Sequence, residues 1–299
     1  MKKTLLVLAV SMAASLACAG AHAADTLAKI KAANKISIGT RDSSAPLAYT
    51  IGNGQYVGYH VDICLKIADA IKANLKMPAM PVEFTVVTSA NRVPLIQNGT
   101  IELECGSTTN NKARAEQVAF APTTYVTNVR TAVKASSGIT SIEQLNGKTV
   151  ATTTGTTSVQ LLRKQLKTGA DFKELFGKDH ADSFLLLESG RADAFVMDDN
   201  ILAGQIVGSK SPADYKIVGE PLSEEPIAIM LPKDDPAFKK VVDDAVKGLM
   251  KSGEIDKIYT KWFLQAIPPR NAIVGMQMTA ALKNAIANPN DNPAESYKK

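Results

Sequence analysis

The chain has 299 residues, of which 45% are hydrophobic, 21% charged and 5% aromatic. This composition is typical of a globular protein of about two domains, and it excludes a disordered or fibrous chain. The net charge is +5, of which Lys2 and Lys3 supply two charges, so the chain after residue 23 carries only +3. So mild a charge, with so few aromatic residues, argues against a nucleic-acid-binding or membrane-surface protein.

Residues 1–23 have the layout of a cleavable secretory signal. Lys2 and Lys3 precede a short apolar stretch, and Ala21–Ala23 matches an A-x-A cleavage site. The alternatives are a membrane anchor, for which the stretch is short, and a lipid on Cys18, whose surroundings only partly match a lipoprotein box. No later segment offers the ~18 consecutive apolar residues of a membrane span, so we expect an exported protein that begins at residue 24.

Two cysteines remain after this segment. Cys64 lies in a predicted helix and Cys105 ends a predicted strand. They pair if the helix packs over that strand, and the alternative is two buried thiols. We expect the disulfide, because the count is even and an exported protein meets an oxidising compartment.

The first half of the chain alternates strands with helices. Helical spacing of apolar residues and two-residue alternation predict, in order, a strand at Lys35–Gly39, a helix at Val61–Leu75, a strand at Val82–Val86, a short helix at Arg92–Gln97 and a strand at Ile101–Cys105. In the last strand, Glu102 and Glu104 alternate with apolar residues. We therefore expect one of its faces to be incompletely buried.

The second half begins with a long extended segment, Tyr125–Lys134, which is expected to cross between domains. The elements predicted after it are a strand at Lys148–Thr153, a helix from Gly155 to Leu166, a helix at Ser183–Glu188 capped by Asp182, a strand at Ala194–Met197, extended segments at Ile217–Val218 and Ile227–Leu231, and helices at Phe238–Met250 and Ile255–Phe263. The first of the last two helices has one apolar face, formed by Ala237, Val241, Ala245 and Leu249. The tail, Asn284–Lys299, is expected to be loosely held.

Alternating strands and helices predict parallel sheets with helices on both faces, here in two sets. The chain passes from one set to the other near Thr127–Arg130 and returns near Gly219–Glu225. We therefore expect residues 24–127 with 222–275 to form lobe 1, residues 128–221 to form lobe 2, and residues 276–299 to form a C-terminal tail. Two lobes joined by two strands leave a cleft between them, which is a common ligand site.

Polar clusters follow the predicted strands, where open α/β sheets bind ligands. The clusters are Thr40–Ser44, Thr88–Arg92, Gly106–Asn111 with Arg114, Thr154–Ser158 and Asp198–Asp199, and His180 precedes a helix. Each cluster alone is explained by helix capping or by a solvent-exposed turn. Hydroxyl groups and arginines recur at the same end of successive strands, however, beside helix N-termini. Together they predict an anion-binding cleft.

Four segments closely resemble a known family, namely Ser89–Arg92, Glu104–Asn111, Lys178–Phe184 and Leu187–Ala192. The family is the extracellular solute-binding proteins of ABC amino-acid importers, family 3, above all the members that bind glutamate and aspartate. The resemblance covers about Thr26 to Asn271. It implies a two-lobed α/β fold of the type II periplasmic-binding-protein class, with the ligand in the interlobe cleft. It also implies a monomeric periplasmic receptor without cofactor that delivers L-glutamate or L-aspartate to the membrane subunits of an importer.

The resemblance also implies a role for each candidate residue. Arg114 and Thr109 would hold the ligand α-carboxylate with the backbone at Thr157, Asp198 (or its neighbour Asp199) with Ser107 would hold the α-ammonium group, and Arg41, Ser89, Arg92 and His180 would face the side-chain carboxylate. One arginine and one acid suffice for the two ends of any amino acid. Two further buried arginines are costly beside a neutral side chain, and they suit a second carboxylate.

Two alternatives stay open. One is a receptor for another polar amino acid, such as glutamine or asparagine. The other is an enzyme on the same scaffold, for instance a dehydratase, in which His180 is the one obvious acid or base because no strand-end cluster supplies a well-placed glutamate. Neither a metal-ligand spacing nor a Walker-type phosphate loop occurs in the sequence, so no metal is expected and ATP belongs to a partner protein.

Overall fold

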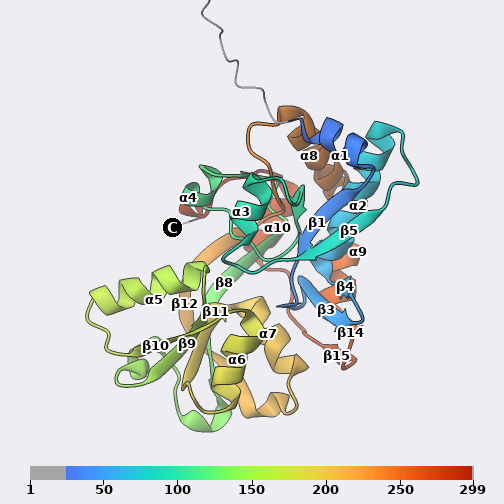
Figure 1. Cartoon of the computed structure of the whole chain (residues 1–299). Helices are drawn as coiled ribbons and strands as arrows, with labels where there is room; N and C mark the ends of the chain where they lie inside the picture. The colour runs from blue at the N-terminus through green and yellow to red at the C-terminus, as the bar shows by residue number, and fades with distance from the viewer. Residues whose placement is uncertain (1–24, 298–299) are drawn as a thin grey trace, which may run out of the picture.

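The computed structural model describes residues 25–297 and shows two lobes (Figure 1). The predicted secretory signal, with Cys18, lies outside the described residues. Lobe 1 is built on a sheet in the order β5-β1-β6-β13-β7, with strands Val82–Val86, Ile36–Thr40, Leu103–Glu104, Met230–Leu231 and Ala119–Phe120. Lobe 2 is built on a sheet in the order β10-β9-β11-β8-β12, with strands Lys173–Gly177, Thr149–Thr153, Ala194–Asp198, Tyr125–Lys134 and Tyr215–Ile227.

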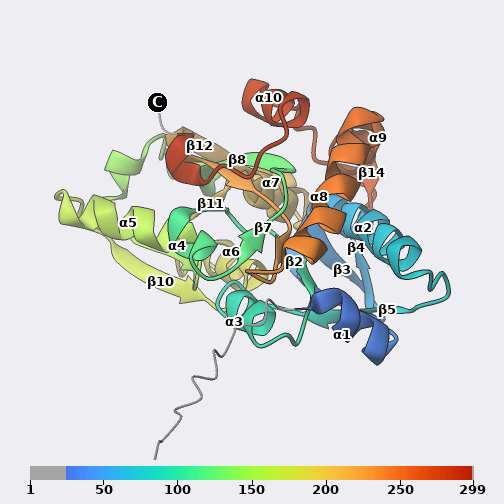
Figure 2. The same cartoon turned by 90° about the horizontal axis from the view of Figure 1, so that it is seen from above.

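Helices cover both sheets, as seen from above in Figure 2. Those of lobe 1 are α1 (Thr26–Ala33), α2 (Tyr59–Leu75), α3 (Arg92–Gln97), α4 (Lys112–Ala115), α8 (Pro236–Lys251), α9 (Glu254–Tyr259) and α10 (Ala280–Ala287). Those of lobe 2 are α5 (Thr157–Lys167), α6 (His180–Glu188) and α7 (Asp199–Gly208). Lobe 1 also carries the small sheet β2-β3-β4, with strands Ser43–Ser44, Ala48–Gly52 and Gln55–Val57, and the pair β14-β15, with strands Ala266–Ile267 and Ala272–Ile273. Across residues 25–297, every helix is too short or too polar to cross a bilayer.

The two lobes are joined by β8 and β12, which pair antiparallel along most of their length. Tyr125 and Ile227, which face each other at one end of this ladder, belong to the hydrophobic core of lobe 1. Val129 and Val133, further along β8, belong to a core of lobe 2. The predicted two-stranded connection is therefore present. Both sheets are mixed, because β8 in lobe 2 and β13 in lobe 1 run antiparallel to their neighbours, so the prediction of parallel sheets was only partly right.

Two predictions of local structure were wrong in lobe 1. Glu102 and Glu104 are both buried, because each carboxylate has partners inside the lobe: Glu102 accepts a hydrogen bond from the Ser37 amide at 2.7 Å, and Glu104 accepts one from the Thr108 hydroxyl at 2.6 Å. The buried stripe of α8 lies one residue beyond the predicted one and consists of Phe238, Val242, Val246 and Met250. Both stripes have helical spacing, and the stripe with the larger side chains faces the core.

Two further predictions failed at helix ends and in the tail. Helix α6 begins at His180 with Asp179 in the N-cap position, so Asp182 lies inside the helix. The described part of the tail is packed against lobe 1, because α10 buries Leu282 and Ala285. Backbone hydrogen bonds then fix the segment beyond it, among them one from the Thr123 amide to the Asn290 carbonyl at 2.9 Å.

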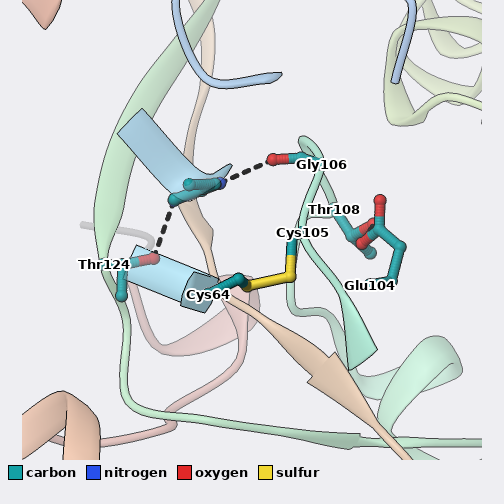
Figure 3. The surroundings of a disulfide bond; sticks show 7 residues. Cys64, Glu104, Cys105, Gly106, Thr108 and Thr124 are labelled. Carbon is teal, nitrogen blue, oxygen red and sulfur yellow. Dashed lines mark hydrogen bonds between the residues drawn. A yellow bond between two sulfur atoms is a disulfide. The ribbon is translucent and has the colours of Figure 1, made fainter. Parts of the chain in front are cut away.

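Helix α2 holds the loop that follows β6 by two links (Figure 3). Cys64 is bonded to Cys105 with a Cα–Cα distance of 6.3 Å, which confirms the predicted disulfide. One turn earlier, His60 Nδ1 donates to the Gly106 carbonyl at 2.6 Å, and its Nε2 accepts from the Thr124 hydroxyl at 2.9 Å. A side chain at Gly106 would collide with the side chains of Glu104 and Arg41, so a larger residue there would have to displace these two buried groups.

We expect replacement of both cysteines, Cys64→Ser with Cys105→Ser, to lower the free energy of unfolding by about 4 kcal/mol, because the bond closes a chain segment of 41 residues in the unfolded state. Urea unfolding under non-reducing conditions measures the change. Wild-type protein with a thiol reductant is the control and should approach the double variant. Equal unfolding midpoints for oxidised wild type and the variant would contradict this prediction.

Candidate functional site

The nine residues expected to bind ligand gather where the two lobes face each other. In lobe 1 they lie in the loops after β1, β5 and β6, at the first residue of α3 and in α4, and these are Arg41, Ser89, Arg92, Ser107, Thr109 and Arg114. In lobe 2 they lie at the first residue of α5, the first residue of α6 and the last residue of β11, and these are Thr157, His180 and Asp198. The carboxyl ends of parallel strands meet at one edge of a sheet, which explains why these segments converge.

Three guanidinium groups share this crevice. Arg41 and Arg92 are buried, and Arg114 is partly buried. Burial together with the charges of Arg114 and Arg41 lowers the pKa of Arg92 to about 9, while Glu104 opposes this shift. Arg41 and Arg114 are both within electrostatic range of Arg92. That the three share one ligand site stays a prediction.

Each of these arginines has an acid of the protein beside it. Arg41 Nη2 forms an ion pair with Asp179 Oδ1 across the lobes, and Arg92 Nη1 lies 3.9 Å from Glu104 Oε1. The pKa of Arg114 is lowered by burial, and Glu225 raises it. The excess of buried positive charge that we expected is therefore largely balanced within the protein. The expectation that no glutamate is well placed was also wrong, because two lie at the site.

Glu225 connects the lobes through hydroxyl groups. Its Oε2 accepts a hydrogen bond from Thr109 in lobe 1 at 2.7 Å and another from Thr157 in lobe 2 at 2.8 Å. A hydroxyl group has one proton, so neither threonine can at the same time donate to a ligand. In this arrangement the donors left for a ligand α-carboxylate are Arg114 and the backbone amides at the start of α5, where the helix dipole also favours an anion.

Asp198 is the acid available for a cation. Its Oδ1 is buried and has no hydrogen-bond partner among the described residues. Burial raises its pKa well above the usual range, and Glu225 and Asp199 add to this effect. Asp199, by contrast, accepts hydrogen bonds from Thr127 Oγ1 at 2.9 Å and from Asn128 Nδ2 at 3.3 Å. This difference favours Asp198 over Asp199 as the partner of an ammonium group.

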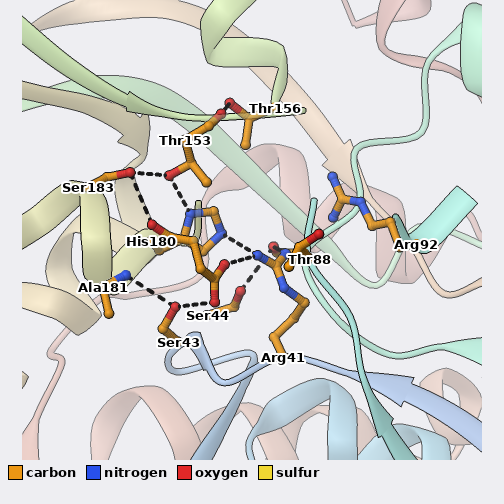
Figure 4. Close-up of polar contacts among 12 residues, drawn as sticks. Arg41, Ser43, Ser44, Thr88, Arg92, Thr153, Thr156, His180, Ala181 and Ser183 are labelled. Carbon is orange, nitrogen blue, oxygen red and sulfur yellow. Dashed lines mark hydrogen bonds and ion pairs between the residues drawn. The ribbon is translucent and has the colours of Figure 1, made fainter. Parts of the chain in front are cut away.

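Both ring nitrogens of His180 are bonded to the protein (Figure 4). Its Nε2 lies 3.3 Å from Arg41 Nη2, and because arginine can only donate, Nε2 is the acceptor. The proton is therefore on Nδ1, which donates to Thr153 Oγ1 at 3.0 Å. Burial lowers the pKa of His180 to about 3, with a contribution from Arg41, so the ring is neutral at pH 7. In this structure His180 orients Arg41 and has no N–H group left for a ligand.

The buried groups of the site without a hydrogen-bond partner include two acceptors, Glu104 Oε1 and Asp198 Oδ1, and several donors. Among the described residues, the buried Nε and Nη1 of Arg92, Nε of Arg41 and the hydroxyl group of Ser89 have no such partner. Figure 4 shows the Arg92 side chain beside the interlobe contacts, with no hydrogen bond drawn to it. A buried donor without a partner costs about 1–3 kcal/mol. These groups therefore suit a ligand that brings acceptor oxygens into the crevice.

The lobes touch on the sides of the site. Arg114 reaches the Thr109 carbonyl in lobe 1 at 2.9 Å and the Gly155 carbonyl in lobe 2 at 3.2 Å. Gly155 has φ +80°, and a side chain there would lie 2.8 Å from the Ser89 backbone. A groove of about 670 Å³, lined by Thr109, Thr157 and Glu225, opens beside the site. No cluster of metal-ligating side chains occurs in the part of the chain that the structure describes.

Comparison with known proteins agrees with this architecture. The sequence profile of the bacterial extracellular solute-binding proteins, family 3, matches residues 36–265. The chain is 44% identical to the L-glutamate/L-aspartate-binding protein of Pseudomonas aeruginosa over 90% of each chain, and 41% identical to the glutamate/aspartate import solute-binding protein of Escherichia coli over 97% of each. The solved solute receptor for L-cysteine of Neisseria gonorrhoeae is 26% identical, with a TM-score of 0.71 over 80% of this chain and 93% of that one. The predicted two-lobed α/β fold is thereby confirmed.

The two buried histidines predict how stability depends on pH. Burial lowers the pKa of His60 to about 4 and that of His180 to about 3, below the ordinary 6.5. In this interval the unfolded chain binds more protons, so the free energy of unfolding falls as pH decreases from 6.5 towards 4. We expect His60→Gln to remove about 2–3 kcal/mol of this fall, measured by urea unfolding at several pH values. A wild type and variant with parallel pH profiles would contradict it.

Proposed function

Because the chain belongs to the bacterial extracellular solute-binding proteins, family 3, we propose that it is the periplasmic receptor of an ABC amino-acid importer and that it binds L-glutamate or L-aspartate between its lobes. The observation that carries the ligand class is the buried guanidinium group of Arg92, whose Nε and Nη1 have no hydrogen-bond partner among the described residues. These two donors, with the hydroxyl group of Ser89, suit a carboxylate on the ligand side chain.

The two ends common to all amino acids bind on either side of this carboxylate. The ammonium group pairs with Asp198 and the Ser107 hydroxyl. The α-carboxylate lies against Arg114 and the backbone amides at the start of α5, since the Thr157 hydroxyl donates to Glu225. Arg41 supports the side-chain carboxylate from behind, held by Asp179 and His180.

Preference for an acidic side chain over an amide comes from hydrogen-bond donors. A carboxylate has only acceptor oxygens, whereas the amide of glutamine or asparagine places an NH₂ group among the donors of Arg92. A mismatch of this kind leaves buried groups unpaired, which is an effective basis for discrimination. The binding proteins of Pseudomonas aeruginosa and Escherichia coli, named for glutamate and aspartate, support the same ligand class.

A catalytic role has less support. His180 is neutral, and both of its nitrogens are bonded within the protein. Glu104 and Glu225 lie beside arginines and accept hydrogen bonds from threonine hydroxyl groups. Their role in the site is therefore structural. We therefore favour a receptor that changes shape and leaves its ligand unaltered.

Transport then follows from closure of the lobes. The secretory signal sends the chain to the periplasm, where residues 24–127 with 222–275 and residues 128–221 move as two bodies about β8 and β12. The ligand binds the closed arrangement better than the open one and so shifts the population towards it. The closed receptor, a monomer, docks on the membrane subunits of the importer, which use ATP through a partner protein.

A ligand panel tests the receptor. Protein refolded without ligand should gain about 2.7 kcal/mol of stability in a thermal-shift assay when glutamate or aspartate is present at 100 times its dissociation constant. Neutral amino acids at the same concentration should give smaller shifts. Stabilisation by neutral amino acids alone would contradict the proposed ligand class.

We expect Arg92→Ala to weaken binding of glutamate and aspartate by about 2–5 kcal/mol, because it removes one partner of a buried charged pair. Isothermal titration calorimetry of the refolded variant measures this loss. Arg191→Ala, which removes an exposed arginine, is the matched control and should bind like wild type. The assignment of Arg92 to the side-chain carboxylate is wrong if Arg92→Ala retains the affinity for glutamate, or if it weakens the binding of glutamine by the same factor.

A further inference from the structure

A second set of contacts joins the lobes next to the ligand site. Asp179 of lobe 2 forms its ion pair with Arg41 of lobe 1, and its other carboxylate oxygen, Oδ2, accepts a hydrogen bond from the hydroxyl group of Ser43 at 2.6 Å. Ser43 lies in β2 of lobe 1 and is drawn with Arg41 and His180 in Figure 4. None of these bonds involves Arg92, Ser89 or Asp198, and Arg41 is the one proposed ligand-site residue that takes part.

The N-terminus of α6 receives its cap from the opposite lobe. Asp179 occupies the N-cap position with extended backbone angles, φ −137° and ψ 179°, yet its side chain makes no capping hydrogen bond. An N-cap side chain normally accepts from the amide two or three residues further on. Here the amide of Ala181, two residues on, donates to Ser43 Oγ at 3.2 Å. Ser43 therefore caps the helix of lobe 2 in place of Asp179.

Ser43 forms hydrogen bonds with two helices of lobe 2, α6 and α7. The Ser43 hydroxyl accepts from Ala181 and donates to Asp179, and the Ser43 carbonyl accepts from Gln205 Nε2 of α7 at 2.7 Å. Gly204, also in α7, approaches the Ala45 backbone so closely that a side chain there would collide with it. All of these contacts form only when the lobes are together.

The ion pair matters because Arg41 is fully buried. A buried guanidinium group without an acid partner is strongly destabilising. Asp179 supplies that partner from the other lobe, so separation of the lobes would remove it. The pKa of Asp179 is consistent with this ion pair. Burial would raise the pKa, but Arg41, His180 and the Ser43 hydroxyl together lower it to about 2.

We propose that Ser43 and Asp179 form a latch that stabilises the closed lobes whichever amino acid is bound. This inference rests on the proposed function, and it names the residues that set the closing equilibrium. When the lobes separate, the Asp179 carboxylate is in position to turn back and cap its own helix. The same side chain then stabilises α6 in the open arrangement and the interlobe contact in the closed one, which makes the closure reversible.

A latch and a ligand contact have different signatures in binding. A latch acts on closure, so its loss lowers the affinity for every ligand by the same factor. Loss of a ligand contact lowers the affinity only for the ligands that make this contact. Ser43→Ala leaves the ion pair of Arg41 intact and removes only the shared hydroxyl group, which makes it the sharper test.

We expect Ser43→Ala to weaken the binding of both glutamate and aspartate about 10- to 100-fold, which is the effect of losing a hydrogen bond to a charged group. The ratio of the two affinities should not change. Asp179→Asn should lose at least as much. Asp182→Asn, an exposed acid on the same helix, is the matched control and should bind like wild type. Calorimetry gives the affinities. A loss confined to one ligand, or wild-type affinity in both variants, would overturn the latch.

Small-angle scattering of the ligand-free proteins separates this proposal from the proposed function. If wild type binds neither acidic amino acid, the proposed function fails, and the latch is then judged by scattering alone. Asp179→Asn should have a larger radius of gyration than wild type and Asp182→Asn, at an unchanged circular dichroism spectrum. Equal radii for all three proteins, at the value calculated for the closed arrangement, would overturn the latch.

Discussion

The pairing of each buried arginine with an acid of the protein is the interaction on which the site depends. Burying three guanidinium groups in one crevice is strongly unfavourable unless acids accompany them. Asp179 forms an ion pair with Arg41, and Glu104 lies beside Arg92. The charge of Glu225 raises the pKa of Arg114. Because the charge is largely balanced internally, we propose that selectivity for a carboxylate depends on unpaired hydrogen-bond donors, those of Arg92 and Ser89 in particular, more than on net charge.

The same acids couple ligand binding to the arrangement of the lobes. Asp179 belongs to lobe 2 and its arginine to lobe 1. Glu225 lies on β12, one of the two connecting strands, and accepts hydrogen bonds from hydroxyl groups of both lobes. Moving the lobes apart therefore changes the partners of the arginines, and binding a carboxylate among them favours the closed form. The proposed closure and the proposed recognition of the ligand thus depend on one set of electrostatic contacts.

Much of this arrangement could be predicted from the sequence, because strand-end positions and helical periodicity are local properties. The strand at Tyr125–Lys134 and the helix at Arg92–Gln97 were predicted correctly, and a ligand site shared by three arginines stays a prediction. The acids were missed because their partners are distant in sequence: Glu104 alternates with apolar residues as a solvent-facing residue would, and only the fold brings Arg92 to it. For the same reason the stripe that α8 buries could not be chosen from its spacing.

A crystal structure with bound glutamate would show which arginine holds the ligand. We expect the side-chain carboxylate of the ligand within hydrogen-bonding distance of Arg92 Nε or Nη1, while Arg41 stays paired with Asp179. A carboxylate bound by Arg41 after release from Asp179, with Arg92 left unbound, would contradict this expectation.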